Sequence, residues 1–321
     1  MPTFALLIAA CLAADPVDVV VVIGAPGAEE YGEKFAEWAA PWEGAATKSQ
    51  ARLTVIGRDE AQEPADRERL QAFLSDHSTG DAELWLILIG HGTFDRREAK
   101  FNLRGPDVSA NDLKAWLAPM KRPVAVIDLS AASAPFLQTL AGPDRVIISA
   151  TKSGGEQNFP YFGGYLSAAI VDPAADLDKD EQVSLWEAYL FASRRTEESY
   201  KTQGRLQTEH ALLDDNGDGQ GTRADAFQGL DAVQASADSK QSLDGDRAHQ
   251  WHLVLSAAEA ALPPDVRRQR DQLELQIAAL KRQKAELTDT QYYARLEALL
   301  VQLATLLKDV PAKLERAHRN N

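Results

Sequence analysis

The stretch LWLILIGHGTFD, residues 84–95, decides the fold class of this chain. Six apolar residues precede Gly90, and His91 then stands between two glycines. Four other runs have the same short and continuously apolar character: VDVVVVIG (17–24), ARLTVIG (51–57), RPVAVIDLS (122–130) and DRVIISATKS (144–153). Runs of this length without polar alternation are typical of strands that are buried on both faces, and they predict central strands of a parallel sheet.

Amphipathic segments lie between these runs, at residues 29–42, 66–76, 109–118 and 136–142. Strands that alternate with helices predict right-handed βαβ crossovers and an α/β fold, here a three-layer sandwich with a mainly parallel sheet. Sites in such sheets form beyond the carboxyl ends of the strands. Because His91 and Ser130 each follow the end of a predicted strand, we expect both at that edge.

The composition narrows the classes of function. The 321 residues carry a formal net charge of -14, which argues against nucleic acid as a partner because phosphate binding needs a basic surface. The glycines after the first strand, Gly24, Gly27 and Gly32, do not make the dinucleotide fingerprint, and the sequence contains no GK[ST] phosphate loop. An acidic chain of this kind favours cations as ligands.

The first 14 residues resemble a secretory leader, because a short apolar segment is followed by small residues. We therefore expect an exported protein, located in the periplasm, at the cell surface or outside the cell. The basic start of a leader is missing, and a buried first strand is the alternative. The segment IAAC, residues 8–11, has the shape of a lipobox, so a lipid anchor at Cys11 is a further alternative. No other segment has the ~20 apolar residues of a membrane span.

Two strand ends carry a resemblance to a known family. A strand that ends in His91-Gly92, followed after one crossover by IDLSAASAPF (127–136), resembles the caspase and legumain clan of cysteine proteases, and most closely its legumain-like (peptidase C13-like) branch. Residues 145–170 are similar to the next strand of that clan and the helix after its pocket loop. The resemblance covers residues 17–225 and implies a caspase-like fold with His91 and Gly92 in the catalytic site.

The departure from the family lies at the nucleophile. If Asp128-Leu129 matches the two residues before the cysteine, Ser130 takes the place of the cysteine, with Ser133 as a nearby alternative. A thiol is partly ionised at neutral pH, whereas an alcohol needs a well-oriented base during attack. Asp95 is a candidate to orient His91, although a loop aspartate is more often a turn former.

The resemblance therefore implies a degenerate protein, non-catalytic or weakly catalytic, that binds peptide or protein segments or acts as a scaffold. The alternative is an active endopeptidase in which Ser130 is the nucleophile and His91 the base. In that case the resemblance implies that backbone amides near Gly92 donate to the oxyanion.

Two acidic loops repeat the ligand spacing of an EF-hand. At positions 1, 3, 5, 7, 9 and 12, the loop at 176–187 offers Asp176, Asp178, Asp180, Gln182, Ser184 and Glu187. The loop at 214–225 offers Asp214, Asn216, Asp218, Gln220, Thr222 and Asp225. Alternate oxygens closed by an acidic residue suit a hard cation, so the pattern predicts structural calcium at the weak affinity of extracellular modules. Two solvated acidic turns are the alternative.

Each acidic loop has one departure from the pattern. In the first loop, Glu181 replaces the glycine that the sharp turn at position 6 requires. In the second loop, position 12 is Asp225, whose side chain is one methylene shorter than the bidentate glutamate of the motif.

The character of the chain changes after the second loop. We predict a caspase/legumain-like domain over residues 15–230, a polar linker over 231–249 and a helical region over 250–321. Near-heptad spacing there predicts an antiparallel helical hairpin, with Val266, Leu273, Ile277, Leu280 and Leu287 in its first run and Leu296, Leu300, Leu303, Leu307 and Val310 in its second. The hairpin either packs on its own domain or joins copies into a homo-oligomer as a short coiled coil. A calcium-stabilised interaction module that acts through this hairpin is a third hypothesis for the function.

Overall fold

The computed structural model describes residues 16–59, 63–228, 231–232 and 244–308. Its centre is a six-stranded sheet in the order β2-β1-β3-β7-β8-β9. The strands are β1 (Asp18–Ile23), β2 (Arg52–Ile56), β3 (Leu84–Ile89), β7 (Val124–Asp128), β8 (Arg145–Ser149) and β9 (Leu212–Asp214). The first five pair in parallel, and β9 joins β8 in antiparallel orientation. The predicted α/β class with a mainly parallel sheet is confirmed.

Burial follows the apolar runs, with one exception. Every residue of β1, β3 and β7 is buried, as expected for strands covered on both faces. β2 is an edge strand, and only its last residue, Ile56, is buried. The prediction of a central strand is therefore wrong for residues 51–57, because β2 has no neighbour on one side. Its first residue, Arg52, donates instead to Asp18 of β1.

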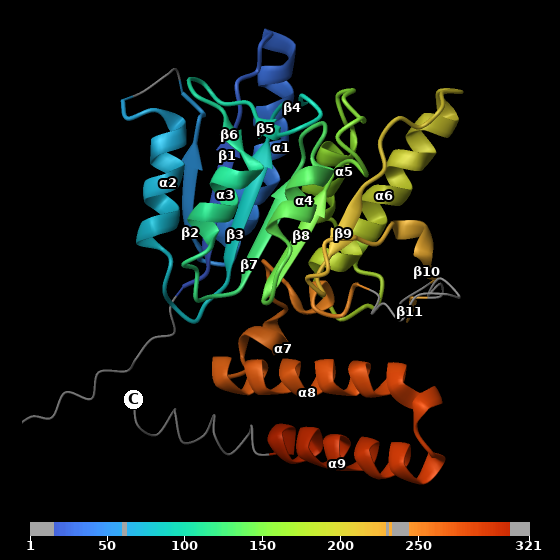
Figure 1. Cartoon of the computed structure of the whole chain (residues 1–321). Helices are drawn as coiled ribbons and strands as arrows, with labels where there is room; N and C mark the ends of the chain where they lie inside the picture. Colours follow the sequence, from blue (N-terminus) through green and yellow to red (C-terminus); the bar gives the residue numbers. More distant parts are fainter. Residues whose placement is uncertain (1–15, 60–62, 229–230, 233–243, 309–321) are drawn as a thin grey trace, which may run out of the picture.

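Helices cover both faces of the sheet and complete three layers (Figure 1). One face carries α1 (Glu29–Lys48), α5 (Phe162–Ala169) and α6 (Leu185–Thr202), and the other carries α2 (Asp66–Asp76), α3 (Ala110–Leu117) and α4 (Ala134–Leu140). The alternation of side chains along each strand divides the core between these faces. In β1, Val19 and Val21 pack in the first cluster, whereas Val20 and Val22 pack in the second.

A small antiparallel sheet lies beyond the carboxyl end of β3. It consists of β4 (Gly92–Phe94), β5 (Ala99–Phe101) and β6 (Val108–Ser109), in that order. The sequence pattern does not predict these strands, because two or three residues are too few to show alternation. The small sheet carries the chain from His91 to the start of α3.

The segment after β8 holds both acidic loops and several short elements. These are η1 (Pro173–Ala175), η2 (Ala224–Ala226), the hairpin of β10 (Phe227–Gln228) and β11 (Asp231–Ala232), and η3 (Ala248–Gln250). After η3, Trp251 and Leu253 join the first core cluster, and the rings of Trp251 and Trp85 pack with their centroids 5.2 Å apart. Much of the predicted linker at 231–249 lies outside the described residues, so the division into domains stays a prediction.

The C-terminal helices form the predicted antiparallel hairpin (Figure 1). α7 (Ala257–Ala260) precedes α8 (Pro264–Arg282), and η4 (Gln283–Glu286) leads into α9 (Asp289–Lys308). The predicted register of α9 is wrong in part, since Leu300 and Leu307 are exposed while Leu299 and Leu306 are half-buried. Residue 310 of that register and the predicted leader at 1–14 lie outside the described residues. Among the described helices, none combines the length and the apolar character that a membrane crossing requires.

Candidate functional site

The ends of β3 and β7 bring the two predicted catalytic segments to one edge of the sheet. These strands are parallel neighbours, with Leu88 opposite Asp128. The Leu129 amide continues the ladder by donating to the carbonyl oxygen of Leu88 at 3.0 Å. His91 and Ser130 therefore leave the sheet side by side, at its carboxyl edge, as the strand pattern predicts.

Gly92 lies in close contact with the turn after β7. A Cβ added to Gly92 would lie 2.1 Å from the carbonyl oxygen of Ala131 and 2.7 Å from Oγ of Ser130. Only a residue without a side chain fits at this approach. The His-Gly pair and the Ser130 turn thus form one compact unit.

The imidazole of His91 is half-buried in an aromatic cluster. Its ring centroid lies 4.7 Å from that of Tyr31, 5.2 Å from that of Phe35 and 5.9 Å from that of Phe159. Nε2 lies 3.1 Å from the carbonyl oxygen of Pro26. Because a carbonyl only accepts, this contact places the proton of the neutral ring on Nε2 and leaves the basic lone pair on Nδ1.

The hydrogen bonds of Ser130 hold its hydroxyl inside the protein, where it is not placed to act as a nucleophile. Its side chain is fully buried, and its hydroxyl donates to Oδ1 of Asp128 at 2.6 Å. Its amide donates to the same oxygen at 3.0 Å. Ser133 is equally buried and pairs with Thr151, with 3.1 Å between the two hydroxyl oxygens. Neither candidate serine presents a free hydroxyl at the surface.

Asp128 is an uncommon carboxylate for a protein interior. It is fully buried, and its second oxygen, Oδ2, has no hydrogen-bond partner among the described residues. Burial raises the pKa of Asp128 to about 6, against the opposing effect of the hydrogen bonds from Ser130. A buried acid with one orphan oxygen and no adjacent cation is the kind of group that functional sites accumulate.

Asp95 forms a turn and does not orient His91. Its Oδ1 accepts hydrogen bonds from the amides of Arg97 and Glu98, both at 2.9 Å. These backbone hydrogen bonds, that of Glu98 first, lower the pKa of the Asp95 carboxyl. The turn interpretation of Asp95 is the one that its contacts support.

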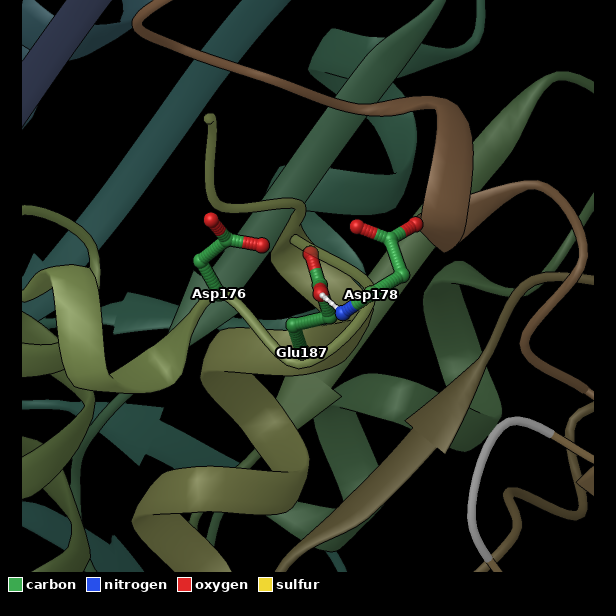
Figure 2. Close-up of side chains that lie close together, drawn as sticks. All are labelled: Asp176, Asp178 and Glu187. Atoms are coloured by element: carbon green, nitrogen blue, oxygen red, sulfur yellow. Dashed lines mark hydrogen bonds between the residues drawn. The ribbon is translucent and has the colours of Figure 1, made fainter. Parts of the chain in front are cut away.

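The first acidic loop gathers three of its six predicted ligands. One oxygen from each of Asp176, Asp178 and Glu187 lies within 4.8 Å of the other two (Figure 2). Asp176 accepts from the amides of Lys179 at 2.7 Å and Glu181 at 3.2 Å, which folds the loop around its carboxylate. The Glu187 carboxylate lies between the two aspartates in Figure 2, so the three side chains converge from both ends of the loop.

The other three predicted ligands of this loop make internal contacts. Asp180 accepts from the side-chain amide of Gln182 at 2.7 Å. The hydroxyl of Ser184 donates to Glu187 at 2.7 Å, and the Ser184–Glu187 pair forms the capping box that starts α6. Glu181 adopts a left-handed φ of 71°, the conformation for which the pattern expects glycine.

The second acidic loop has the same turns, but its position-12 residue does not turn toward the other predicted ligands. Asp214 accepts from the amides of Gly217 at 3.0 Å and Gly219 at 2.5 Å, as Asp176 does in the first loop. The further oxygens of Asn216 and Asp218 accept from amides two residues on, at 2.8 Å each. Asp225 does not close this loop, because its exposed side chain pairs with Arg223 at 2.8 Å.

A residue from outside the motif, Asp244, occupies the space beside the second loop. Its carboxylate accepts from the amide of Asp215 at 2.9 Å and from the hydroxyl of Thr222 at 2.5 Å. Burial raises the pKa of Asp244 to about 7, and burial together with the charge of Asp244 raises that of Asp214 to about 6. Gln220 contributes its amide to Asp218.

Three features of these sites escape the sequence pattern. The Pro26 carbonyl and the orphan oxygen of Asp128 depend on backbone placement, which no residue type signals. Asp244 lies 19 residues beyond the end of the second loop motif, in a polar run without periodicity. An aspartate in such a run carries no signal of burial until the fold places it.

One cavity of the structure lies away from His91 and Ser130, neither of which is among the residues that line it. It measures about 790 Å³ and runs along α6, where its lining includes Phe191, Arg194, Arg195, Glu209 and His210. The position of His91 at the sheet edge, and not a cavity, therefore defines the candidate site.

Comparisons with known proteins found similarity among solved structures and none in sequence. No protein-family model matches the chain, and no curated protein matches it in sequence. Among solved structures, the Drosophila initiator caspase Dronc is similar with a TM-score of 0.39 and 13% sequence identity, over 65% of this chain and 81% of that chain.

Proposed function

We propose that this chain is a degenerate caspase- or legumain-like protein that binds peptide or protein segments without cleaving them efficiently. The observation that carries the proposal is Ser130, which stands where the resemblance places the cysteine, is fully buried and donates its hydroxyl to Asp128. An alcohol must lose its proton to a base as it attacks. Here the proton points to a buried carboxylate, and no described hydrogen bond joins Ser130 to His91.

The surroundings of His91 support a binding role. The cluster of Tyr31, Phe159 and the imidazole is half-buried, and Tyr161 next to it is 38% exposed. The ammonium group of Lys34 lies 5.3 Å from the ring centroid of Tyr31 and 5.5 Å from that of Phe159. Aromatic faces beside a cation suit apolar and acidic side chains of an extended peptide.

The test compares cleavage and binding in one set of variants. The parent, His91→Ala, Ser130→Ala and Ser130→Cys are incubated with a diverse peptide library in calcium, and cleavage is followed by mass spectrometry. We expect no cleavage by the parent. Cleavage that is lost in both alanine variants would instead establish the active endopeptidase. Activity gained by Ser130→Cys alone would show that only the thiol is missing from the site.

Binding is measured with the same library immobilised as an array. We expect Tyr161→Ala and His91→Ala to lose retained peptides, while Leu300→Ala, a substitution at a 46% exposed side chain of α9, retains them. Equal binding by all variants would remove the aromatic cluster from the proposed function.

A second proposal is structural calcium in the first acidic loop. The convergence of Asp176, Asp178 and Glu187 supports it, since a cation among three carboxylates so close together would relieve their mutual repulsion. The bound ion would supply charge neutralisation and would fix the start of α6, while these three residues would hold it. The second loop fits less well, because Asp225 is turned outward.

Thermal melts with calcium and with a chelator test this proposal. We expect calcium to raise the Tm of the parent, and Asp178→Ala to abolish the rise. Asp218→Ala is the matched control in the second loop and should retain most of the effect. Identical melts of the parent in both buffers would remove calcium from the proposal.

Export is the third part of the proposed function. The leader-like residues 1–14 support it, as does an acidic chain whose single cysteine, Cys11, lies within that segment. Expression of the full chain followed by N-terminal sequencing of the exported product tests it. A product that begins near residue 15 supports a cleaved leader, a lipidated product that begins at Cys11 supports an anchor, and a full-length product retained in the cytoplasm contradicts both.

A further inference from the structure

The outer face of α9 carries apolar side chains that the hairpin does not bury. Tyr293 is 56% exposed, Leu300 46% and Leu307 40%, and Val301 beside them is 57% exposed. The first three follow one another at intervals of seven residues. A seven-residue interval brings side chains back to the same side of a helix, so they form a straight apolar seam along α9.

The seam is separate from the contact between the two helices of the hairpin. α9 meets α8 through a second set of side chains, which are buried or half-buried: Tyr292, Leu296, Leu299, Leu303 and Leu306. α8 lies between α9 and the central sheet, so α9 is the outermost layer among the elements that the structure describes (Figure 1). The apolar arc of α9 is therefore wider than one partner helix requires.

We infer that a second copy of this chain covers the seam, with the two α9 helices packed antiparallel about Leu300. Leu300 lies midway between Tyr293 and Leu307 in the sequence. An antiparallel pair thus sets Leu300 against Leu300 and each Tyr293 against the Leu307 of the other copy. One face that matches itself in this way is what a two-fold symmetric interface requires.

The charges at the ends of α9 select the antiparallel orientation. The helix begins at Asp289 and ends at Lys308, and both residues are exposed. An antiparallel pair brings the acidic start of one helix near the basic end of the other, whereas a parallel pair brings like charges together. The helix dipoles favour the same orientation. The result is a bundle of four helices, two from each copy.

The composition of residues 309–321 argues against this segment of the same chain as the occupant of the seam. Residues 309–321, DVPAKLERAHRNN, contain few large apolar side chains to place against four exposed ones. A helix of 20 residues is about 30 Å long, and a second α9 matches the seam over that full length.

Sedimentation and light scattering of the full chain across a range of micromolar concentrations test the inference. We expect a dimer whose dissociation constant rises by about 100-fold or more in Leu300→Asp, because the substitution places two charges at the two-fold axis. Leu206→Asp is the matched control, since it adds the same charge at a 90% exposed leucine of the α/β domain and should leave the dimer intact. Unchanged circular dichroism of both variants excludes unfolding as the cause.

Disulfide cross-linking tests the orientation. In a Cys11→Ser background, a mixture of Tyr293→Cys and Leu307→Cys chains should form mixed cross-links readily, while neither variant alone should cross-link as well. Preferential cross-linking of Tyr293→Cys with itself would overturn the antiparallel arrangement.

Two further outcomes would overturn the inference as a whole. One is a full chain that stays monomeric throughout, including the case in which removal of residues 309–321 first permits a dimer, because the tail would then be the occupant. The other is a dimer that Leu300→Asp leaves intact, which would place the interface elsewhere. Peptide binding at the His91 cluster is measured separately and does not depend on either result.

Discussion

Each end of the central sheet buries an aspartate, and the two carboxylates differ in their partners. Asp18 begins β1 at the amino edge, and Asp128 ends β7 at the carboxyl edge; both are fully buried. Asp18 is matched by cations, since Arg122 donates to it at 2.6 Å and Arg52 at 2.8 Å. Asp128 has only the two groups of Ser130, and one of its oxygens has no partner among the described residues.

The difference shows which end of the sheet serves stability and which holds the candidate site. A buried charge that is paired and fully hydrogen-bonded can be retained at little net cost, whereas an unmatched one destabilises the fold. Ligands of parallel α/β sheets bind at the carboxyl edge. The unmatched acid Asp128 ends β7 at that edge, where His91 follows the neighbouring strand β3, so the candidate site lies at the end of the sheet that is less well matched.

The largest loss of stability is expected when the ion pair between Arg122 and Asp18 is removed. Arg122→Ala should lower the free energy of unfolding by about 3–5 kcal/mol, because it removes a 95% buried cation and leaves the charge of Asp18 inside the fold. Urea denaturation at pH 7 measures the loss. Arg52→Ala is the control: its side chain is 52% exposed, so the cost should be about 1 kcal/mol or less. Equal losses would mean that burial does not distinguish the two arginines.

At the unmatched end, the expected signature is a pH dependence. The pKa of Asp128 is about 6 in the folded chain, against ~3.9 for an unfolded aspartate. Its contribution to stability is therefore complete below pH ~4 and is lost as the pH rises through about 6, a loss on the order of 2–3 kcal/mol. Asp128→Asn keeps an oxygen for Ser130 but cannot ionise, so the slope should flatten in this variant. Parallel stability curves for parent and variant between pH 4 and about 7 would contradict the raised pKa.

A smaller effect should follow from filling the close approach at Gly92. Gly92→Ala should cost about 1–3 kcal/mol, because the new Cβ would lie 2.1 Å from the Ala131 carbonyl oxygen and the turn must move. Gly44→Ala, within α1 and with no atom within 4 Å of the added Cβ, should instead stabilise by about 0.5–1 kcal/mol. The pair is compared by thermal and urea unfolding. A neutral Gly92→Ala would mean that the two strand ends are not closely packed.

The smallest effect should come from Ser130→Ala. Loss of the hydroxyl removes one hydrogen bond to Asp128 and should cost about 1 kcal/mol. Because that hydrogen bond lowers the pKa of Asp128, its loss should move the pH midpoint upward, the direction opposite to a loss of burial. The midpoint of the pH-dependent stability change reports this shift, and an unmoved midpoint would show that Ser130 does not tune the acid.

The sequence predicts the sheet well because buried parallel strands leave a strong signal. All five apolar runs are strands, and residues 66–76 are a helix at the predicted bounds. The edge position of β2 and the three strands of β4–β6 could not be read in this way, since pairing order and two- or three-residue strands leave no periodic pattern. In α9, two adjacent leucine registers fit the same sequence, and only packing against α8 selects one of them.

For the candidate site, the sequence predicts which residues lie at the strand ends, but it does not predict where their side chains point. The proximity of His91 to Ser130 follows from parallel neighbours that end together. The burial of Ser130, the orphan oxygen of Asp128 and the outward turn of Asp225 depend on side-chain directions in irregular segments. Calcium ligation by the twelve motif positions remains a prediction, and the convergence of three first-loop carboxylates is its strongest support.

The strand order also determines the sequence of events by which the chain acquires its fold. β1 pairs with β2 and β3, and all three strands lie within residues 18–89, so they are made before the rest of the sheet. β9 must wait for α5 and α6 to be made before it can meet β8, and Trp251 arrives later still to pack against Trp85. During synthesis, β1, β2 and β3 therefore emerge before the strands on the β8 side of the sheet. The acidic loops belong to the segments that close it last, so a cation that orders them would act at the final stage of folding.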